Sequence, residues 1–316
     1  MFVETGVRTI NSNGLLEQFE GHLTSTSLAP ATVVNYTADL RAFLRWSEAS
    51  GATRALADPS ADGPFDLAST DIQAYCSYLQ HTKKHVPATI NRRLQALRKF
   101  YDFAIQQGWT PANPASDVQL LSEVVSDRSR GLTADDVERL LAAVRKSRTR
   151  RANRDWAIFQ VLLHAGLKLG ELTQLRLADL ELGAESPYLC VFHNSGNPGR
   201  RTIPLEGEVC DALRAYLPQR QAAPGVDYVF VNRDGNPLST RTVQRLLHQY
   251  AQAAALENLT TQSLRYVYAT RAYEQSGDLK TVARLLGHRH LATTIRYLRS
   301  SGAQQTQFDN DNSDGT

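Results

Sequence analysis

Three side chains suited to phosphate chemistry follow one another near the end of the chain. Arg265 lies in the string LRY, His288 ends the string LLGH, and Tyr297 ends the string TTIRY nine positions later. An arginine can hold phosphate oxygens through two parallel hydrogen bonds, and a tyrosine hydroxyl can act as a nucleophile. The chemistry open to such a set is attack on a phosphodiester. Without a metal this needs cations at the phosphate, a nucleophile and an acid for the leaving oxygen.

This order and spacing resemble the C-terminal motifs of the tyrosine recombinases, the family of phage integrases and Xer-like resolvases. The resemblance extends over residues 14–300. It implies that Tyr297 attacks double-stranded DNA and forms a 3′-phosphotyrosine, so that strands are rejoined without ATP or another cofactor. It also implies that Arg265 clamps the scissile phosphate and that His288 contacts this phosphate and helps to orient the nucleophile.

Two positions of the expected site differ from the family pattern in residue type. The first family arginine is Lys168, within GLKLGEL, which keeps the charge but loses the planar fork. Glu171, in the same string, matches the family's acidic residue and supports the framework of the site. The family's histidine or lysine three positions before the second arginine is Gln262, which can hydrogen-bond to phosphate but cannot carry a proton.

A third departure lies in the turn of the expected β-hairpin, where the family has a proton-donating lysine and residues 193–201 contain none. His193 could supply a proton there. Arg200 and Arg201 could supply charge for DNA binding, but an arginine is a poor acid because it stays protonated.

These residues leave several functions open. The retained Arg265, His288 and Tyr297 favour a divergent site-specific recombinase that cuts and rejoins DNA. The departures favour a degenerate paralogue that binds DNA as an architectural or regulatory protein. A type IB topoisomerase, which uses the same phosphotyrosine, fits the helical N-terminal region and the Leu-Gly-His spacing less well. A helix-rich nucleic-acid module without enzymatic activity is the simplest alternative.

The elements that must position these residues begin with a helical region over residues 14–111. Apolar residues recur at helical spacing in four stretches, 16–23, 33–44, 72–79 and 90–105. Pro30 is expected to open the second helix, Asp71 to cap the third, and Gly108 to end the fourth. We therefore expect a small bundle of four amphipathic helices.

A second domain is expected over residues 132–300. Residues 112–131 are polar and without periodicity, which predicts an interdomain linker, and the polar tail 301–316 is predicted to be disordered. Thr133 can cap the first helix of the second domain while Asp136 reaches back to it.

A change of pattern within the second domain predicts a β-hairpin. The β-rich runs 188–192 and 201–205 flank a turn of Gly, Asn and Pro, and helical patterns resume from Val209 to Tyr297. The predicted fold is therefore mainly α, with a helical domain and a mixed α/β domain containing a small hairpin or sheet. The resemblance implies a core-binding (SAM-like) domain and a catalytic domain that together form a C-shaped clamp around duplex DNA.

Affinity for nucleic acid must come from local clusters, because the net charge is only +3. In the first domain the candidate DNA-binding cations are Lys83, Lys84, Arg92, Arg93 and Lys99. Six cations occupy ten positions in the second domain: Arg145, Lys146, Arg148, Arg150, Arg151 and Arg154. Each cluster is either a DNA contact or a solvated face.

Several classes of protein are disfavoured. Cys76, Cys190 and Cys210 are isolated, which argues against disulfides or a zinc module and suits a reducing cytoplasm. His290 lies two positions after His288, but no third ligand has suitable spacing, so we expect no metal. No leader or membrane-spanning run is evident, so we expect a soluble cytoplasmic protein.

The resemblance also implies partners. Recombinases of this kind act as homo-tetramers assembled on paired DNA sites, and some use a partner recombinase. The sequence does not choose among integration of a mobile element, its excision and resolution of cointegrates.

Overall fold

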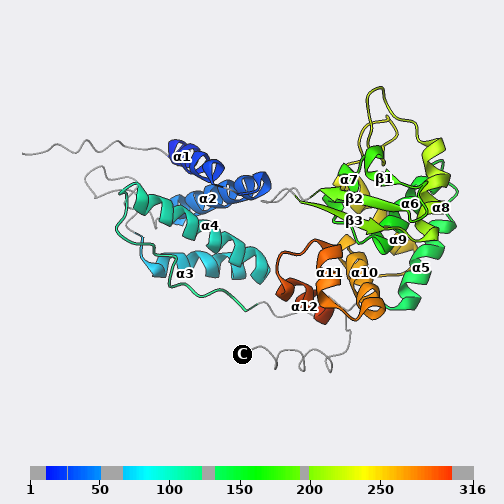
Figure 1. The fold of residues 1–316 in the computed structure, drawn as a ribbon. Coiled ribbons are helices and arrows are strands. Elements are labelled where there is room, and N and C mark those ends of the chain that lie inside the picture. Colours follow the sequence, from blue (N-terminus) through cyan, green and yellow to red (C-terminus); the bar gives the residue numbers. More distant parts are fainter. Residues whose placement is uncertain (1–11, 27, 51–66, 123–131, 193–198, 301–316) are drawn as a thin grey trace, which may run out of the picture. The chain divides into compact units, whose positions relative to one another are not determined.

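The computed structural model describes residues 12–26, 28–50, 67–122, 132–192 and 199–300, without the side chains of residues 299 and 300. The chain divides into two compact units, Met1–Val124 and Val125–Thr316 (Figure 1). Each unit has its own hydrophobic core.

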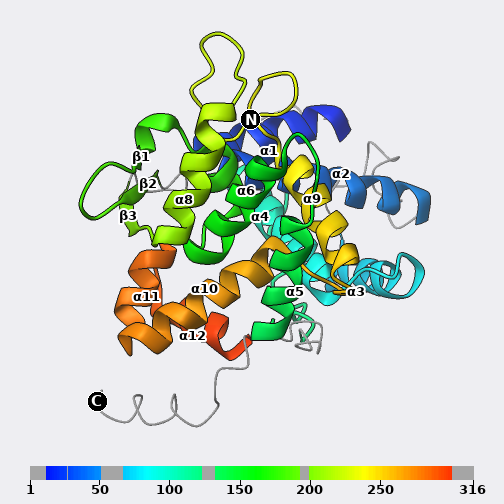
Figure 2. The same cartoon turned by 90° about the vertical axis from the view of Figure 1, so that its right-hand side faces the viewer.

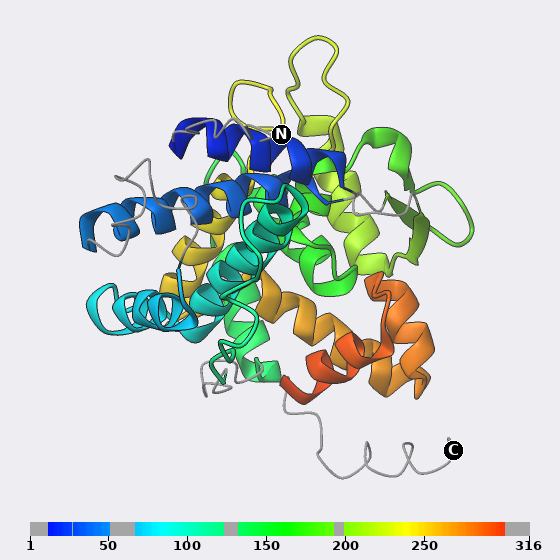
Figure 3. The ribbon, with the colours of Figure 1, turned by 90° about the vertical axis from the view of Figure 1, so that its left-hand side faces the viewer.

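The first unit is the expected helical bundle. Its helices are α1 (Ser12–Ser25), α2 (Pro30–Ser50), α3 (Ser69–Ser77), which continues into a π-helical turn (Tyr78–Thr82), and α4 (Pro87–Gln106). Helix α2 packs against both α1 and α4 (Figure 3). Buried aromatic rings fill the centre, among them Phe19 and Phe100, whose centroids are 5.5 Å apart in an edge-to-face contact.

Two expectations for this unit need correction. The cap of α3 is Ala68, and Asp71 occupies the third helical position, where its carboxylate accepts the Ala68 N–H at 2.9 Å. The beginning of the expected linker, residues 112–121, instead packs against α4. Asn91 exchanges hydrogen bonds of 2.9 and 2.8 Å with the backbone of Leu121, and Val118 is 5% exposed. These contacts were missed because they use side chains of α4 rather than a local periodicity.

The second unit contains eight helices and three strands among its described residues, besides two short 3₁₀ turns. They are α5 (Ala134–Arg145), α6 (Ala152–His164), α7 (Leu169–Gln174), β1 (Leu180–Glu181), β2 (Tyr188–Phe192), β3 (Arg200–Pro204), α8 (Gly207–Tyr216), α9 (Thr240–Ala253), α10 (Thr261–Ser276), α11 (Leu279–Leu286) and α12 (Leu291–Ser300). The predicted start of α5 is confirmed. Thr133 accepts the Asp136 N–H at 3.1 Å, and the Asp136 carboxylate accepts the Thr133 N–H at 2.9 Å.

The predicted hairpin is confirmed and belongs to a three-stranded antiparallel sheet of order β1-β2-β3. Leu189 pairs with Ile203, and both side chains are fully buried. The edge strand β1 was not predicted because it has only two residues. The prediction of continuous helical structure from Val209 to Tyr297 is wrong between α8 and α9. There, Pro224, Gly225 and the run from Asn232 to Pro237 form turns and isolated bridges.

The last three helices, α10 to α12, lie together (Figure 2) and form a small core of their own. Its buried members are Tyr268, Ala269, Ala272, Val282, Leu286 and Leu298. The larger core contains α5, α6, α8, α9 and the sheet, together with Leu264 of α10. Helix α10 therefore joins the two cores. Among the described helices, none is long and apolar enough to cross a membrane.

Candidate active site

The backbone between α6 and α7 holds Lys168 in a constrained position. Gly166 has a φ of +55°, and a Cβ at this residue would lie 2.2 Å from Cδ1 of Tyr268, so only glycine fits. Two residues later the Lys168 N–H donates to the Glu171 carboxylate at 2.7 Å, which closes the first turn of α7. The Lys168 side chain therefore starts from a fixed point beside Glu171.

Glu171 is held by Arg201 of strand β3. The two Arg201 terminal nitrogens donate to the two carboxylate oxygens at 3.0 and 2.7 Å, and its Nε donates to the Leu285 carbonyl at 2.9 Å. Burial alone would raise the pKa of Glu171, but the hydrogen bonds and charge of Arg201 outweigh it and leave the pKa lowered. Arg201 thus links the sheet, α7 and α11 through one ionised carboxylate.

Arg265 of α10 lies beneath this pair and is 1% exposed. Its guanidinium donates to the carbonyls of Gly166 and Leu286, and its Nη1 is 3.9 Å from a Glu171 oxygen. Its buried Nε has no hydrogen-bond partner among the described residues. Burial lowers the pKa of Arg265, although the charge of Glu171 opposes this shift.

His288 follows the left-handed Gly287 that ends α11, where φ is +67°. Its Nδ1 lies 3.0 Å from the hydroxyl of Thr294, which is fully buried in α12. Burial, followed by the charges of Arg265, Lys168 and Arg201, lowers the pKa of His288 to about 4. The imidazole is therefore neutral at pH 7, with Nε2 outside the bond to Thr294.

Tyr297 of α12 is in contact with side chains of α10 and with His288. Gln262 donates a hydrogen bond from Nε2 to the Tyr297 hydroxyl. The rings of Tyr266 and His288 meet the Tyr297 ring edge to face, with centroids 4.6 and 4.7 Å away. The Arg265 Cζ is 6.0 Å from the Tyr297 centroid. These contacts fix the phenol ring beside the buried guanidinium.

The cluster carries more positive than negative charge. Lys168, Arg201 and Arg265 surround the single carboxylate of Glu171. Burial lowers the pKa of Lys168, the charges of Arg265 and Arg201 lower it further, and Glu171 raises it. A hollow of about 660 Å³, lined in part by Lys168, Glu171 and the β2 residue Phe192, opens beside the cluster. Of the three cations around Glu171, Lys168 lines this hollow, so an anion in the hollow would meet its ammonium group.

Family models match both units. One described as the phage integrase family matches residues 130–304, and one described as the phage integrase N-terminal SAM-like domain matches residues 15–110. This chain belongs to the phage integrase family of tyrosine recombinases.

Individual tyrosine recombinases are similar to this chain in sequence or in fold. The chain is 30% identical over 304 residues to the tyrosine recombinase XerC of Roseiflexus sp. (strain RS-1), covering 93% of this chain and 92% of the relative. The fold is similar to a lambda integrase dimer bound to a COC′ core site, with a TM-score of 0.70, 21% identity and coverage of 92% and 96% of the two chains. It is also similar to the XerH recombinase bound to a palindromic difH substrate, with a TM-score of 0.69, 18% identity and coverage of 94% of each chain.

The structure brings together the residues that the family motifs single out, from α7, α10, α11 and α12 and the segments between them: Lys168, Glu171, Gln262, Arg265, His288 and Tyr297. The sequence did not indicate two further contacts. Thr294 lies within the TTIRY string, but nothing in its spacing shows that it binds His288. Gly166 opens the GLKLGEL string, but its contact with Tyr268 spans a hundred residues.

The two hairpin arginines have different environments. Arg200 is exposed, with its Cζ 5.6 Å from the centroid of the Phe192 ring. Arg201 is 6% exposed and bound to Glu171 and Leu285, so its guanidinium is occupied within the protein. The expected DNA contact by Arg201 is therefore corrected to an internal ion pair. His193 and the rest of the turn through residue 198 lie outside the described residues.

The cations of the first unit also differ from one another. Lys83, Lys84 and Lys99 are exposed. Arg92 binds the carboxylate of Asp39, which is 4% exposed, and the Arg93 Nε lies 3.5 Å from the same carboxylate. Arg93 also donates to the Tyr75 hydroxyl at 3.1 Å. Arg92 and Arg93 thus neutralise a buried acid, while the three lysines present charge at the surface.

Among the described residues no three His, Cys, Asp or Glu side chains are grouped as a metal ion would require. His290 is exposed.

Proposed function

We propose that this tyrosine recombinase homologue cuts and rejoins duplex DNA through a covalent bond between Tyr297 and a 3′ phosphate. The observation that carries the proposal is the meeting of Tyr297 with Arg265, His288 and Lys168, which come from separate segments of the chain. No local folding requirement explains why a phenol, a neutral imidazole and two cations should gather around so little negative charge.

In the proposed reaction the Tyr297 oxygen attacks phosphorus, a new O–P bond forms, and the bond to the 5′ oxygen breaks. Arg265 and Lys168 neutralise the non-bridging oxygens. The neutral His288 accepts the phenol proton, and the arriving phosphate anion raises its pKa from about 4 by offsetting the nearby cations. Rejoining reverses these steps, and the phosphotyrosine preserves the bond for a second strand.

We assign the proton for the leaving 5′ oxygen to Lys168. Its ammonium group has a lowered pKa, caused first by burial and then by the charges of Arg265 and Arg201, so it releases a proton more readily than a surface lysine. Arg201 contributes as a positioning residue, because its two bonds to Glu171 hold the acceptor of the Lys168 N–H. Gln262 positions the Tyr297 hydroxyl until the phosphate replaces it.

The partner of this reaction is double-stranded DNA with paired sites. Support comes from two similar folds, a lambda integrase dimer on a core site and XerH on a palindromic substrate. We propose that two protomers bind one inverted repeat, that two such sites assemble a homo-tetramer, and that the two units clamp the duplex. The exposed Lys83, Lys84, Lys99 and Arg200 would contact the phosphate backbone.

The test is formation of a covalent protein–DNA adduct. Purified protein is incubated with supercoiled plasmid carrying the DNA that flanks its own gene, and the reaction is stopped with denaturant. We expect an adduct with the wild-type chain and none with Tyr297→Phe, which keeps the ring contacts but removes the nucleophile. Tyr266→Phe is the matched control, because Tyr266 packs on the same ring and is not expected to attack.

A second function, DNA binding without cleavage, is favoured by one observation. Arg265 already donates to two main-chain carbonyls, and the Tyr297 hydroxyl is bonded to Gln262, as in an idle site. Specific binding in a shift assay without any adduct would support this alternative. Cleavage regained in the double variant Lys168→Arg and Gln262→His would then locate the defect in these two positions.

A further inference from the structure

A second cationic site lies at the other end of helix α6. A hollow of about 680 Å³ there is lined by five arginines and a single acid: Arg150, Arg151, Arg154, Arg220, Arg233 and Asp234. Arg150 and Arg151 directly precede α6, whereas Lys168 follows its last residue, His164. The thirteen residues of α6 separate the two sites by about 20 Å along the helix.

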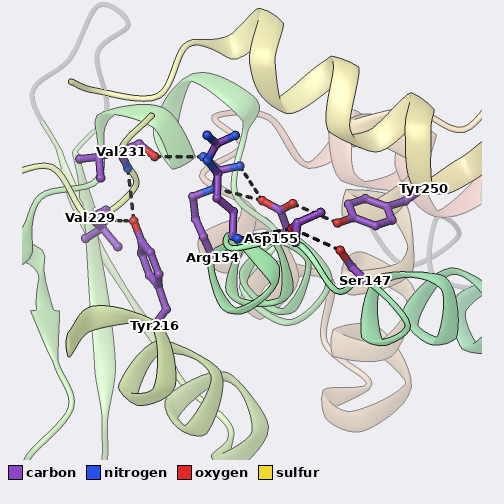
Figure 4. Close-up of polar contacts among 9 residues, drawn as sticks. Ser147, Arg154, Asp155, Tyr216, Val229, Val231 and Tyr250 are labelled. Atoms are coloured by element: carbon purple, nitrogen blue, oxygen red, sulfur yellow. Dashed lines mark hydrogen bonds and ion pairs between the residues drawn. The ribbon is translucent and has the colours of Figure 1, made fainter. Parts of the chain in front are cut away.

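The back of this hollow is a rigid, hydrogen-bonded wall (Figure 4). Arg154, 6% exposed, donates to Asp155 at 3.0 and 2.7 Å and to the Val231 carbonyl at 3.2 Å. The Tyr250 hydroxyl donates to the other Asp155 oxygen at 3.0 Å, and the Tyr216 hydroxyl joins the backbones of Val229 and Val231. Arg154 is thus fixed in place before any ligand arrives.

Arg220 extends the same wall. Its Nε donates to the Tyr228 carbonyl at 2.8 Å and its Nη2 to the Val226 carbonyl at 2.7 Å. An arginine has five N–H donors, so these two bonds leave others for a ligand. Fixed donors reduce the entropy that binding an anion would otherwise cost.

The front of the hollow is formed by exposed charged side chains. Arg150 and Arg151 are exposed, and Arg233 has an ion pair of 3.2 Å with Asp234 in which both side chains are more than half exposed. Exposed ion pairs of this kind contribute little to stability, so a ligand can readily replace one partner. With Asp155 and Asp234 as the acids in contact with the five arginines, the site has an excess of three positive charges.

The chemistry of this lining favours phosphate over a protein partner. Guanidinium groups match phosphate oxygens in two-point hydrogen bonds, and the amides of Gln219, Gln221 and Asn232 in the lining are also typical phosphate contacts. Only Tyr216 and Val231 add carbon-rich surface, which is too little for the apolar centre of a protein interface. We propose that this hollow binds the phosphate backbone of duplex DNA, outside the stretch held at Tyr297.

The experiment compares two matched pairs of substitutions in the full-length chain carrying Tyr297→Phe. Arg150→Ala with Arg151→Ala removes two cations of the hollow. Lys146→Ala with Arg148→Ala removes two exposed cations of the same basic segment that do not line it. Binding of a labelled 40-bp duplex of arbitrary sequence is followed by fluorescence anisotropy at several salt concentrations. We expect the hollow pair to lower the salt dependence by about two phosphate contacts and to weaken binding about tenfold, with little change for the control pair.

Equal effects of the two pairs would overturn the proposal and identify the whole segment as a solvated basic face. Failure of the parent protein to bind the duplex, or competition by polyglutamate but not by unlabelled DNA, would overturn it as well. The outcome is separable from the proposed strand cleavage. If the chain with Tyr297 intact forms no adduct while the hollow pair still alters the salt dependence, the proposed cleavage fails and the second DNA site stands.

Discussion

Two carboxylates in the second unit, the buried Asp155 and the partly buried Glu171, are each bound by arginine, yet their surroundings differ. Asp155 accepts two hydrogen bonds from Arg154 and one from Tyr250, all within 3.0 Å. Glu171 accepts two from Arg201 and one from the Lys168 N–H, and a second guanidinium, that of Arg265, lies 3.9 Å away. The first centre pairs one cation with one acid, and the second crowds three cations around one.

We interpret the Asp155 centre as a structural ion pair and the Glu171 centre as part of a site for a phosphate group. Within the Arg154–Asp155 pair one positive charge balances one negative charge, and the pair is held by hydrogen bonds inside the fold. Around Glu171 the excess of cations lowers the pKa of His288, after the larger effect of burial. A bound phosphate would neutralise the excess positive charge around Glu171. The repulsion among the cations in the free protein would then be relieved, and this relief would favour the complex.

The substitution Arg154→Met tests whether Asp155 is a structural centre, and it is expected to have the largest effect. Removal of the guanidinium leaves Asp155 buried with only Tyr250 as a side-chain partner, and we expect the free energy of unfolding to fall by about 3–5 kcal/mol. Urea denaturation measures the change. Arg233→Met, at an exposed ion pair, is the control and should change it by about 0.5 kcal/mol or less. A small loss at Arg154 would show that Asp155 is not a structural centre.

Arg265→Met tests the other centre. We expect adduct formation to slow by about 10²–10³-fold, because a donor to the phosphate is lost in the transition state. The free energy of unfolding should fall much less than for Arg154→Met, because the substitution removes a desolvated cation whose neighbours already include Arg201 and Lys168. A large loss of stability with unchanged cleavage would reverse the roles of the two centres.

Lys168→Arg asks whether the lowered pKa of Lys168 is used to move a proton. We expect adduct formation on ordinary DNA to slow by about 10²-fold, because an arginine keeps the charge but is a poor acid. On DNA with a 5′-bridging sulfur at the scissile bond the defect should disappear, because a thiolate leaves without protonation. Equal slowing on both substrates would mean that Lys168 only binds phosphate.

The smallest expected effect is a pH dependence of stability caused by His288. The pKa of His288 is lowered to about 4 in the folded chain, so between about pH 6.5 and pH 4 the unfolded chain binds more protons. Stability from this group is therefore present above pH 6.5 and lost as the pH falls. From pH 7 to pH 5 the wild type should lose about 2 kcal/mol more than His288→Gln, measured by urea denaturation at each pH. Added sulfate should reduce this difference if an anion occupies the site.

The features that could be predicted from the sequence are those determined by residues that lie close together in it. The start of α5 was predictable because Thr133 and Asp136 satisfy each other three residues apart. The hairpin was predictable because two β-rich runs, residues 188–192 and 201–205, flank a turn of Gly, Asn and Pro. The turns between α8 and α9 carry Pro and Gly signals, but the helical patterns on either side concealed them.

For the candidate site, the family motifs predicted which residues to examine, but not how they are held. Nothing in the sequence shows that Arg201 binds Glu171, because the two are thirty residues apart and lie on different elements. The same holds for the bond from Gln262 to Tyr297 and for the burial of Arg265 beneath Glu171. Contacts of this kind depend on how helices pack, which local spacing does not specify.

The small core of α10, α11 and α12 has a consequence for when the nucleophile is available. Tyr297 lies on α12 and His288 in the turn between α11 and α12, and the buried residues of these two helices are not shared with the larger core. Lys168 and Glu171 belong to a segment that packs on the larger core. The helix pair α11–α12 can therefore have its own opening free energy, smaller than that of global unfolding. Such an opening would separate the phenol from the cations without loss of the rest of the domain. Amide hydrogen exchange would register α11 and α12 as one foldon, and the opening free energy would set how often Tyr297 leaves its place beside the cations.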